Sequence, residues 1–197
     1  MVFWRLGRCS LTIALLVEGA TDKYIFKELA RRILGEKIGV EIRDLHGAGN
    51  ILNENKIIAR LDTFSKNKKI SKIIICKDSE CTPDTKTRRE LEELRKKINA
   101  QRYSTPIHYV VVNHAPEAWL LGDPETIAKY LNKKVIVKAS DTNDCRPKEL
   151  LESFFQKAKK GLIAIRDYPK LSESVDINKI CGNNQSFNSF VKILKDH

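Results

Sequence analysis

The sequence predicts an α/β fold: a mostly parallel sheet flanked by helices, followed by a mainly helical C-terminal extension. Three observations support this prediction. Short apolar runs alternate with amphipathic helical patterns through the first 113 residues, which is typical of parallel sheets with helices on both faces. Two of these runs, residues 11–17 and 72–76, are typical of strands that are covered on both faces. Helical patterns dominate the rest, so we divide the chain into an α/β domain, residues 1–121, and an extension packed on it, residues 122–197.

The first strand and helix are expected at the start of the α/β domain. Residues 11–17, LTIALLV, are apolar on both faces of a strand. Gly19 ends this strand, and Thr21 is expected to cap the helix that follows. Apolar residues then recur at helical spacing as far as Leu34. Residues 39–45, GVEIRDL, alternate in the manner of a shorter strand.

The same alternation of elements continues to the end of the α/β domain. HGAGN forms a glycine turn, and residues 51–64 form the next helix. KIIIC, residues 72–76, is a short buried strand that leads into the loop DSECTPDT. Residues 86–100 form a strongly charged helix, and residues 107–113, IHYVVVN, form the next strand.

The extension carries three helix-start signals. Pro124 and Pro147 each stand in the first turn of an amphipathic pattern, where proline is tolerated. Ser186 is expected to cap the last helix. KVIVKAS, residues 134–140, resembles a strand but has no strand-like neighbour.

Composition indicates a globular chain with a basic surface. Apolar residues make up 42% of the 197 residues and charged residues 31%, which excludes a disordered class. Lys and Arg exceed Asp and Glu by 36 to 25, which gives a net charge of +11. Such an excess favours polyanion partners, nucleic acid first. A lysine-rich surface that serves solubility explains the same charge equally well.

The cysteine usage and the hydropathy of the sequence indicate where in the cell the protein is located. Five cysteines occur, with no C-x-x-C pair, which is typical of the reducing cytoplasm rather than of a disulfide framework or a zinc site. The N-terminus has basic residues before a short apolar run, but it lacks the cleavage pattern of a signal peptide. No stretch approaches the ~18 apolar residues of a membrane span. We therefore expect a cytoplasmic protein without a membrane partner.

Acidic residues follow the predicted strands. Glu18 follows the first strand, Asp22 lies one helical turn later, and Asp78 and Glu80 follow KIIIC. Ligands of open α/β sheets bind at the carboxyl ends of the strands, and residues two apart in an extended chain point the same way. Four carboxylates without a basic partner would repel one another, and a bound Mg²⁺ is the usual way in which proteins offset such repulsion. The alternative is that strand ends are acidic because they meet water.

Glu117 is a further candidate for this edge of the sheet. It stands in HAPEAWLL, just past the strand at residues 107–113. Its alternative role is that of a carboxylate at a helix start, which the helix dipole favours.

These residues carry a resemblance to a known family. LLVEGATDKYIF, HGAGN and IIICKDSE resemble the toprim domain of topoisomerases, primases and OLD-type nucleases, which has a Glu after its first strand and a D-x-D after a later one. The chain is more closely similar to the toprim-like DUF4276 family, a domain of unknown function, in PEAWLLGDPE and in DYPKL followed by SFNSFVKIL. The resemblance covers nearly the whole chain.

The resemblance implies roles for the acidic residues. Glu18, Asp78 and Glu80 would be catalytic groups and metal ligands, and Asp22 matches the acid of an OLD-like pattern that helps to hold a second metal. Lys170, in DYPKL, matches a basic position that would bind phosphate. Glu80 departs from the family's Asp by one methylene. Because Mg²⁺ is strict about geometry, a one-metal site, a shifted second site and a decayed site all stay open.

The function we expect is Mg²⁺-dependent, or Mn²⁺-dependent, phosphodiester hydrolysis of nucleic acid by a toprim-type nuclease, in defence or repair. Glu18, Asp78 and Glu80 would hold the ions, with Asp22 and Glu117 completing the shell. A non-catalytic module that binds metal or nucleic acid with a partner protein is the alternative. A receiver-like domain with Asp78 as phosphoacceptor is a third interpretation. The sequence leaves open a homodimer or a partner encoded in the same operon.

Overall fold

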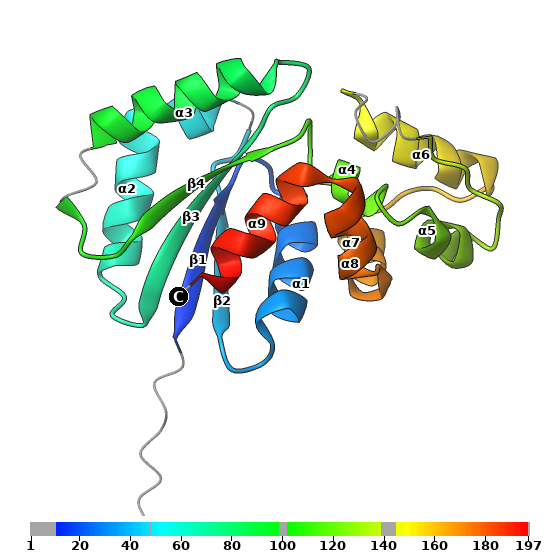
Figure 1. Ribbon diagram of the computed structural model, residues 1–197, viewed down its shortest axis with the longest axis horizontal. Coiled ribbons are helices and arrows are strands. Elements are labelled where there is room, and N and C mark those ends of the chain that lie inside the picture. Colours follow the sequence, from blue (N-terminus) through cyan, green and yellow to red (C-terminus); the bar gives the residue numbers. More distant parts are fainter. Residues whose placement is uncertain (1–10, 48, 99–101, 139–144, 197) are drawn as a thin grey trace, which may run out of the picture.

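Four parallel strands form a single sheet in the computed structural model, which describes residues 11–47, 49–98, 102–138 and 145–196. The strand order is β2-β1-β3-β4 (Figure 1). The strands are β1 (Thr12–Val17), β2 (Gly39–Asp44), β3 (Ile70–Asp78) and β4 (Ile107–Val112). The α/β class is therefore confirmed, and each strand lies where its apolar run predicts. Strand β3 extends two residues beyond KIIIC at each end.

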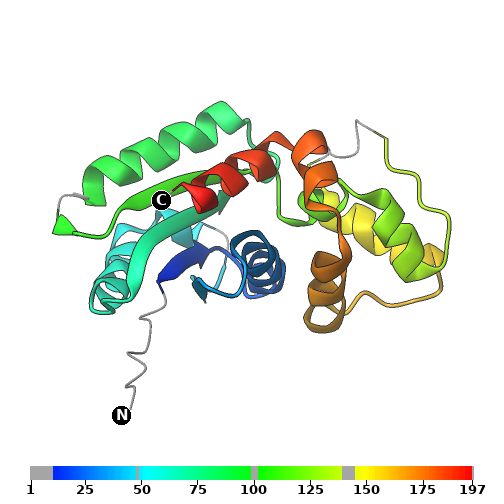
Figure 2. The same cartoon turned by 60° about the horizontal axis from the view of Figure 1, so that its bottom comes forward.

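Helices cover both faces of the sheet. Helix α1 (Asp22–Leu34) and helix α9 (Gln185–Lys195) cover one face, while α2 (Glu54–Ser65) and α3 (Asp84–Ile98) cover the other (Figures 1 and 2). A short 3-10 helix, η1 (Asn50–Leu52), precedes α2. Each face therefore has its own hydrophobic cluster, as expected for strands that are apolar on both sides.

The alternation of strand β1 explains how one segment supplies both clusters. Ile13, Leu15 and Val17 pack into the cluster under α1 and α9. Ala14 and Leu16 pack into the cluster under α2 and α3. Successive side chains of a strand point to opposite faces, so an unbroken apolar run fills two cores. Burial of this surface contributes roughly 25 cal/mol per Å².

The C-terminal region is helical and shares the first of these clusters. Its helices are α4 (Glu117–Leu120), α5 (Pro124–Leu131), α6 (Pro147–Lys157), α7 (Ala164–Ser174), α8 (Ile177–Asn183) and α9. Pro124 and Pro147 stand at the starts of α5 and α6 as predicted. Helix α7 has no counterpart in our sequence analysis because Pro169, which lies inside it, disfavours a helix prediction.

Two local expectations for this region are wrong. The cap of α9 is Asn184, whose side chain accepts from the Phe187 N–H, and not Ser186. The Ser186 hydroxyl instead accepts a hydrogen bond from the indole of Trp119. Residues 134–138 of the KVIVKAS segment form no strand, and its last two residues lie outside the described part of the chain.

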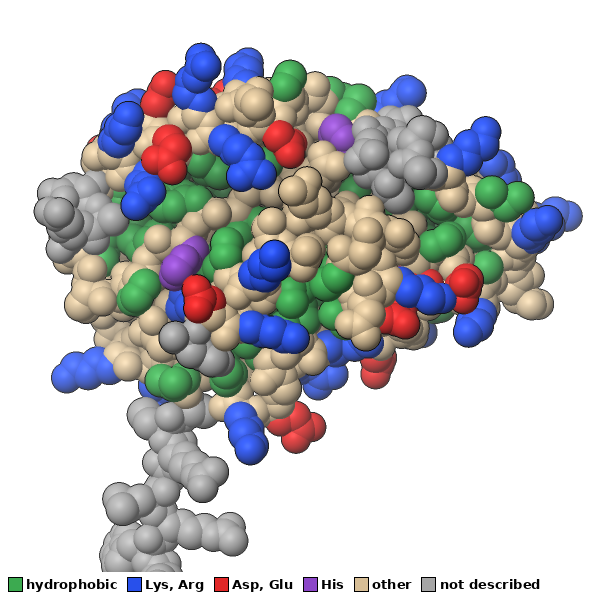
Figure 3. Space-filling view, in the orientation of Figure 1, with side chains coloured by type: hydrophobic (Ala, Val, Ile, Leu, Met, Phe, Trp, Pro, Cys, Tyr) green, Lys and Arg blue, Asp and Glu red, His purple; other side chains and the backbone are tan. Residues whose placement is uncertain are grey.

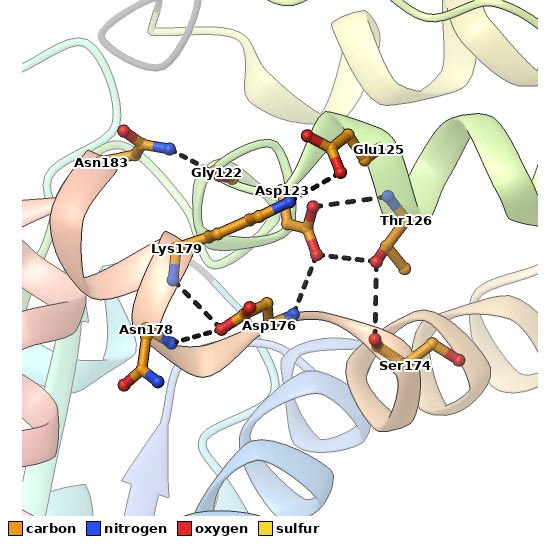
Figure 4. Close-up of polar contacts among 9 residues, drawn as sticks. All are labelled: Gly122, Asp123, Glu125, Thr126, Ser174, Asp176, Asn178, Lys179 and Asn183. Atoms are coloured by element: carbon orange, nitrogen blue, oxygen red, sulfur yellow. Dashed lines mark hydrogen bonds and ion pairs between the residues drawn. The ribbon is translucent and has the colours of Figure 1, made fainter.

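Helices α5 and α8 are joined by a hydrogen-bond network (Figure 4). Asp123 caps α5 through the Thr126 N–H and hydroxyl, and it also accepts from the Asp176 N–H at 2.8 Å. Asp176 in turn caps α8. The ammonium group of Lys179 lies 2.7 Å from a carboxylate oxygen of Glu125. Each buried polar group of this network therefore has a partner, which fixes the relative position of the two helices.

The surface carries charges of both signs. Figure 3 shows Lys and Arg side chains interspersed with Asp and Glu on the face displayed, without one continuous basic patch. None of the helices in the described residues has the length and apolar character needed to cross a bilayer.

Candidate functional site

The carboxyl ends of β1 and β3 meet at the centre of the sheet. Strand β1 continues through α1 to β2 on one side, and β3 continues through α3 to β4 on the other. The chain therefore diverges between β1 and β3, which is the position where open α/β sheets bind ligands. Glu18 follows β1 and Asp78 ends β3, so both lie at this position. The sequence analysis predicts this placement.

Glu18 is buried and has a cationic partner. The ammonium group of Lys77 lies 3.4 Å from its Oε1 atom and 3.3 Å from the Asp78 carbonyl oxygen. Our expectation that the acids lack a basic partner is therefore wrong. The parallel register explains the pairing, because Leu16 lies opposite Ile75 and two further residues bring Glu18 beside Lys77. Burial still raises the pKa of Glu18, with Lys77 opposing and Glu80 and Asp22 adding to it.

Asp22 is held by the turn that leads from β1 into α1. Its Oδ2 atom accepts from the Gly19 N–H at 2.7 Å. A Cβ atom on residue 19 would lie 2.9 Å from the same oxygen, so glycine permits this close approach. Thr21 precedes the helix, but its side chain makes no cap hydrogen bond. Burial raises the pKa of Asp22, while the Gly19 hydrogen bond and Lys148 lower it.

Glu117 joins the site from α4. It is buried, and its Oε1 atom accepts from the Tyr168 hydroxyl of α7 at 2.6 Å. Burial raises the pKa of Glu117, the Tyr168 hydrogen bond lowers it, and Asp22 raises it. Our sequence analysis has no role for Tyr168, since its pairing depends on how α7 packs against α4. Glu117 is thus both the first residue of α4 and one of the acids at the sheet edge, so the two roles considered for it do not exclude each other.

Asp78 experiences the charge of the other carboxylates. Its pKa lies well above the ordinary value because of burial first, and then because of Asp22, Glu18 and Glu117. Lys77 opposes this increase only as the smallest of the five influences. Four carboxylates are thus close enough to repel one another, which costs free energy in the metal-free protein.

Contrary to our expectation from their spacing, Glu80 does not point the same way as Asp78. Strand β3 ends at Asp78, and Glu80 is exposed with a φ of 49°, so the alternation that would align the two side chains is broken. The Glu80 N–H donates to the His114 carbonyl, and the His114 N–H donates to the Ser79 hydroxyl. These bonds tie the loop after β3 to the loop after β4. Glu80 nevertheless adds to the negative potential at Glu18.

The next residue of this loop forms a disulfide. Cys81 is bonded to Cys145, which lies 64 residues later and just before α6. Our expectation of cysteines without a disulfide is wrong for this pair. The sequence has no spacing signal for it, since two loops far apart in the chain meet only in the folded protein. Cys76 and Cys181 are unpaired.

Helix α6 adds a cation that our sequence analysis does not identify. Lys148 is exposed near the start of α6, and its charge lowers the pKa of both Asp22 and Glu117. Lys148 and Lys77 thus approach the carboxylates from different elements. Lys170 does not join them. It lies on α7 in a separate pocket with Tyr130 and Lys160.

The donor set suits a hard divalent cation, because carboxylate oxygens are the ligands that Mg²⁺ and Mn²⁺ prefer. In the positions that the structure gives, no three His, Cys, Asp or Glu side chains of the described residues form a metal-binding group. Lys77, the Gly19 N–H and the Tyr168 hydroxyl each occupy an oxygen of one carboxylate. Asp78 has no such hydrogen bond within the described residues.

Comparison with curated proteins and with solved structures gives no significant match. A family model matches residues 17–195, from the end of β1 to the end of α9. The match thus includes the carboxylates at the sheet edge and all the described helices of the extension. The chain belongs to this family, described as Domain of unknown function (DUF4276).

Proposed function

We propose that the chain is a divalent-metal-dependent nuclease that hydrolyses phosphodiester bonds with Mg²⁺ or Mn²⁺ at the carboxyl end of the sheet. The observation that carries this proposal is the environment of Asp78, whose pKa is raised by burial and by three other carboxylates. A bound divalent cation converts that repulsion into attraction. The toprim-like order of Glu18 after β1 and of Asp78 and Glu80 after β3 supports the same activity.

The proposed ligands come from neighbouring elements. Asp78 and Glu18 would hold the ion from adjacent strands, and Asp22 would join them from the start of α1. Glu117, positioned by Tyr168, completes the negative field from α4. A bound Mg²⁺ lowers the pKa of a coordinated water and stabilises charge on a phosphate. Glu80 lies on the outer side of this set, so its carboxylate is available to a substrate or to a second ion.

The two lysines have a proposed role in substrate binding. Lys77 neutralises Glu18 in the metal-free protein. If Glu18 instead held an ion, the Lys77 ammonium would be available to contact a phosphate oxygen. Lys148 provides a second cation from the exposed start of α6. The net charge of +11 favours a polyanionic substrate. We also propose a homodimer or an operon-encoded partner and a cytoplasmic location, although the Cys81–Cys145 disulfide removes the cysteine argument for that compartment.

Metal binding and cleavage test the proposal together. Chelator-treated wild type, Asp78→Asn and Glu18→Gln are titrated with Mg²⁺ and Mn²⁺ in thermal unfolding experiments and then assayed on labelled DNA and RNA. We expect the ion to raise the wild-type Tm by about 5 °C at saturation. Both variants should lose this increase, and cleavage should fall by at least about 100-fold. Glu93→Gln, which removes an exposed carboxylate of α3, should behave like wild type.

A non-catalytic module is the second candidate. It is favoured by one observation, which is that Glu18, Asp22 and Glu117 already have hydrogen-bond partners in the metal-free fold. Ion-dependent binding of nucleic acid without any cleavage would select this candidate. A wild type whose Tm and cleavage do not respond to either ion at millimolar concentration would exclude the nuclease.

A further inference from the structure

A pocket of about 480 Å³ lies in the helical extension, lined by residues of α5, α6, α7 and the segment before α7. Its volume falls in the range of small-molecule sites, roughly 300–1,000 Å³. The lining has two chemically different parts. The basic part consists of Lys160, Arg166 and Lys170, and the apolar part consists of Tyr130, Phe155 and Ile163.

The basic part is organised by one buried carboxylate. Asp167 is fully buried and binds Arg166 through two hydrogen bonds of 2.8 and 3.0 Å. It also accepts from the Tyr130 hydroxyl and from the Ile163 N–H. Burial alone would raise the pKa of Asp167, but these donors lower it below the ordinary value. The carboxylate is therefore ionised, and it fixes the guanidinium group at the pocket wall.

The pocket retains an excess of positive charge. Lys160 and Lys170 form no ion pair with any described residue, so three cations face a single carboxylate. The Lys160 ammonium lies 5.9 Å from the centroid of the Tyr130 ring and 3.3 Å from the Tyr130 carbonyl oxygen. Such a surplus of ammonium and guanidinium donors suits a phosphate group.

The apolar part suits a planar body attached to that phosphate. The Tyr130 ring is half-buried, and the Ile163 side chain is 48% exposed. Aromatic faces stack on nucleic-acid bases in a sequence-tolerant way. Within the pocket lining, Ile163 therefore offers exposed apolar surface next to the Tyr130 ring.

The pocket is separate from the carboxylate site at the sheet edge. Arg166 and Lys170 are four residues apart on α7 and therefore share one face of the helix. Tyr168, which binds Glu117, lies two residues from each and about 200° away around the axis. Helix α7 thus presents Tyr168 to the carboxylates and its basic residues to the pocket.

We propose that this pocket binds a phosphate group carried on a planar base, that is, a nucleoside monophosphate, either free or at the phosphorylated end of a nucleic-acid strand. The cationic residues hold the phosphate and the Tyr130–Ile163 side holds the base. This inference does not rest on the proposed nuclease activity, because none of the lining residues belongs to the carboxylate site.

Isothermal titration of the full chain, with EDTA present, tests the pocket without metal chemistry. The probes are AMP, adenosine, inorganic phosphate, and a short single-stranded DNA with and without a 5′-phosphate. We expect AMP to bind at least about tenfold more tightly than adenosine or phosphate. The double variant Lys160→Gln/Lys170→Gln should weaken AMP binding by about tenfold or more. Lys192→Gln, which removes an exposed lysine of α9, should bind as wild type does.

The remaining measurements distinguish a free nucleotide from a strand end, and the pocket from the carboxylate site. Binding of the 5′-phosphorylated strand in preference to both AMP and the unphosphorylated strand would identify a strand end as the occupant. Arg166→Lys keeps the positive charge but loses the two hydrogen bonds to Asp167 that fix the side chain at the pocket wall. This variant should therefore bind AMP more weakly than wild type does, while circular dichroism shows a folded protein. The proposal is overturned if no probe binds, if the double variant binds as wild type does, or if Glu18→Gln abolishes binding to the same extent.

Discussion

The helical extension and the ends of β1 and β3 both contain buried carboxylates, and the pKa values in these two regions are shifted in opposite directions. In the helical extension, Asp123 is 2% exposed and has three hydrogen-bond donors (Figure 4). Burial would raise its pKa, but these donors lower it below the ordinary value. At the sheet edge, Glu117 is 3% exposed and Asp78 lies beside three other acids, and their pKa values are raised.

The direction of the pKa shift distinguishes carboxylates with a structural role from candidate functional carboxylates. Where a carboxylate holds helices together, the fold surrounds it with N–H and O–H donors. At the ends of β1 and β3, the fold gathers four carboxylates and supplies fewer donors than their charge requires. Perturbed pKa values of this kind cluster at functional sites. Three substitutions sharpen the comparison, and we consider them from the largest expected effect to the smallest.

Removal of the structural carboxylate should have the largest effect. Asp123→Ala eliminates the cap of α5 and removes the acceptor of the Asp176 N–H, whose hydrogen bond is part-buried. A cap contributes about 1 kcal/mol, and a hydrogen bond of this kind contributes about 0.5–1.5 kcal/mol. We expect the free energy of unfolding, measured by urea denaturation, to fall by about 1.5–2.5 kcal/mol.

The matched control for this loss is the neighbouring Glu125. Its carboxylate pairs with Lys179 at 2.7 Å, but both side chains are exposed. Surface pairs contribute about 1 kcal/mol or less, so Glu125→Ala should cost far less than Asp123→Ala. Equal losses in the two variants would contradict the structural assignment of Asp123.

Removal of a sheet-edge charge should have the opposite sign. Burial and neighbouring acids raise the folded-state pKa of Asp78 above its unfolded value. The folded state therefore binds this proton more tightly, so stability is full at low pH and falls as pH rises through the folded pKa. Asp78→Asn should stabilise the metal-free protein near pH 8 by about 1 kcal/mol. Its Tm should also decline less than that of wild type between about pH 5 and about pH 8.

Thermal unfolding in EDTA across this pH range measures the effect. The lowered pKa of Asp123 acts in the other direction, because its contribution is lost only as pH falls below the ordinary value of 3.8. The two regions are thus distinguished by pH alone. A wild-type Tm that rises from pH 5 to pH 8, with no gain in Asp78→Asn, would contradict the repulsion that we describe.

The smallest effect is expected at Gly19. In Gly19→Ala, the new Cβ would approach the Asp22 carboxylate to 2.9 Å. Because Asp22 Oδ2 is the end of a flexible side chain, it should rotate away at a cost below about 1 kcal/mol. The displaced carboxylate should nevertheless reduce the Tm increase produced by Mg²⁺.

Gly182 provides the control for Gly19. A Cβ there meets no atom within 4 Å, and the residue lies in α8. Gly182→Ala should therefore be neutral or stabilising, by up to about 1 kcal/mol, with an unchanged response to Mg²⁺. A Gly19→Ala variant whose Mg²⁺ response equals that of wild type would show that the Asp22 position does not matter.

Local patterns were sufficient for the four strands and most of the helices. Apolar runs and helical spacing depend on residues close in the sequence, so β1 and α1 could be placed without knowledge of the fold. The rule that ligands bind at the carboxyl ends of parallel strands placed Glu18 and Asp78 together. Helix α7 was missed because Pro169 disfavours a helix locally, while packing against α1 and α5 compensates in the folded protein.

The partners of the acids could not be predicted in the same way. Lys77 is one lysine among many in the sequence, and only the register of β1 against β3 brings it to Glu18. Glu80 follows a pattern that predicts alternation with Asp78, but hydrogen bonds to the loop after β4 turn it outward. The pairing of Tyr168 with Glu117 depends on the packing of two helices that are distant in the chain.

The sequence by itself determined the order of strands and helices and the presence of acids at strand ends, because both follow from periodicity and from the fixed direction of parallel strands. Only the tertiary structure decided which groups meet those acids, and that a basic and aromatic pocket forms beside α7. These outcomes depend on strand register and on helix packing between segments that are far apart in the sequence. The Cys81–Cys145 pair, with a separation of 64 residues, is an example. Contacts of that separation leave no local pattern in the sequence.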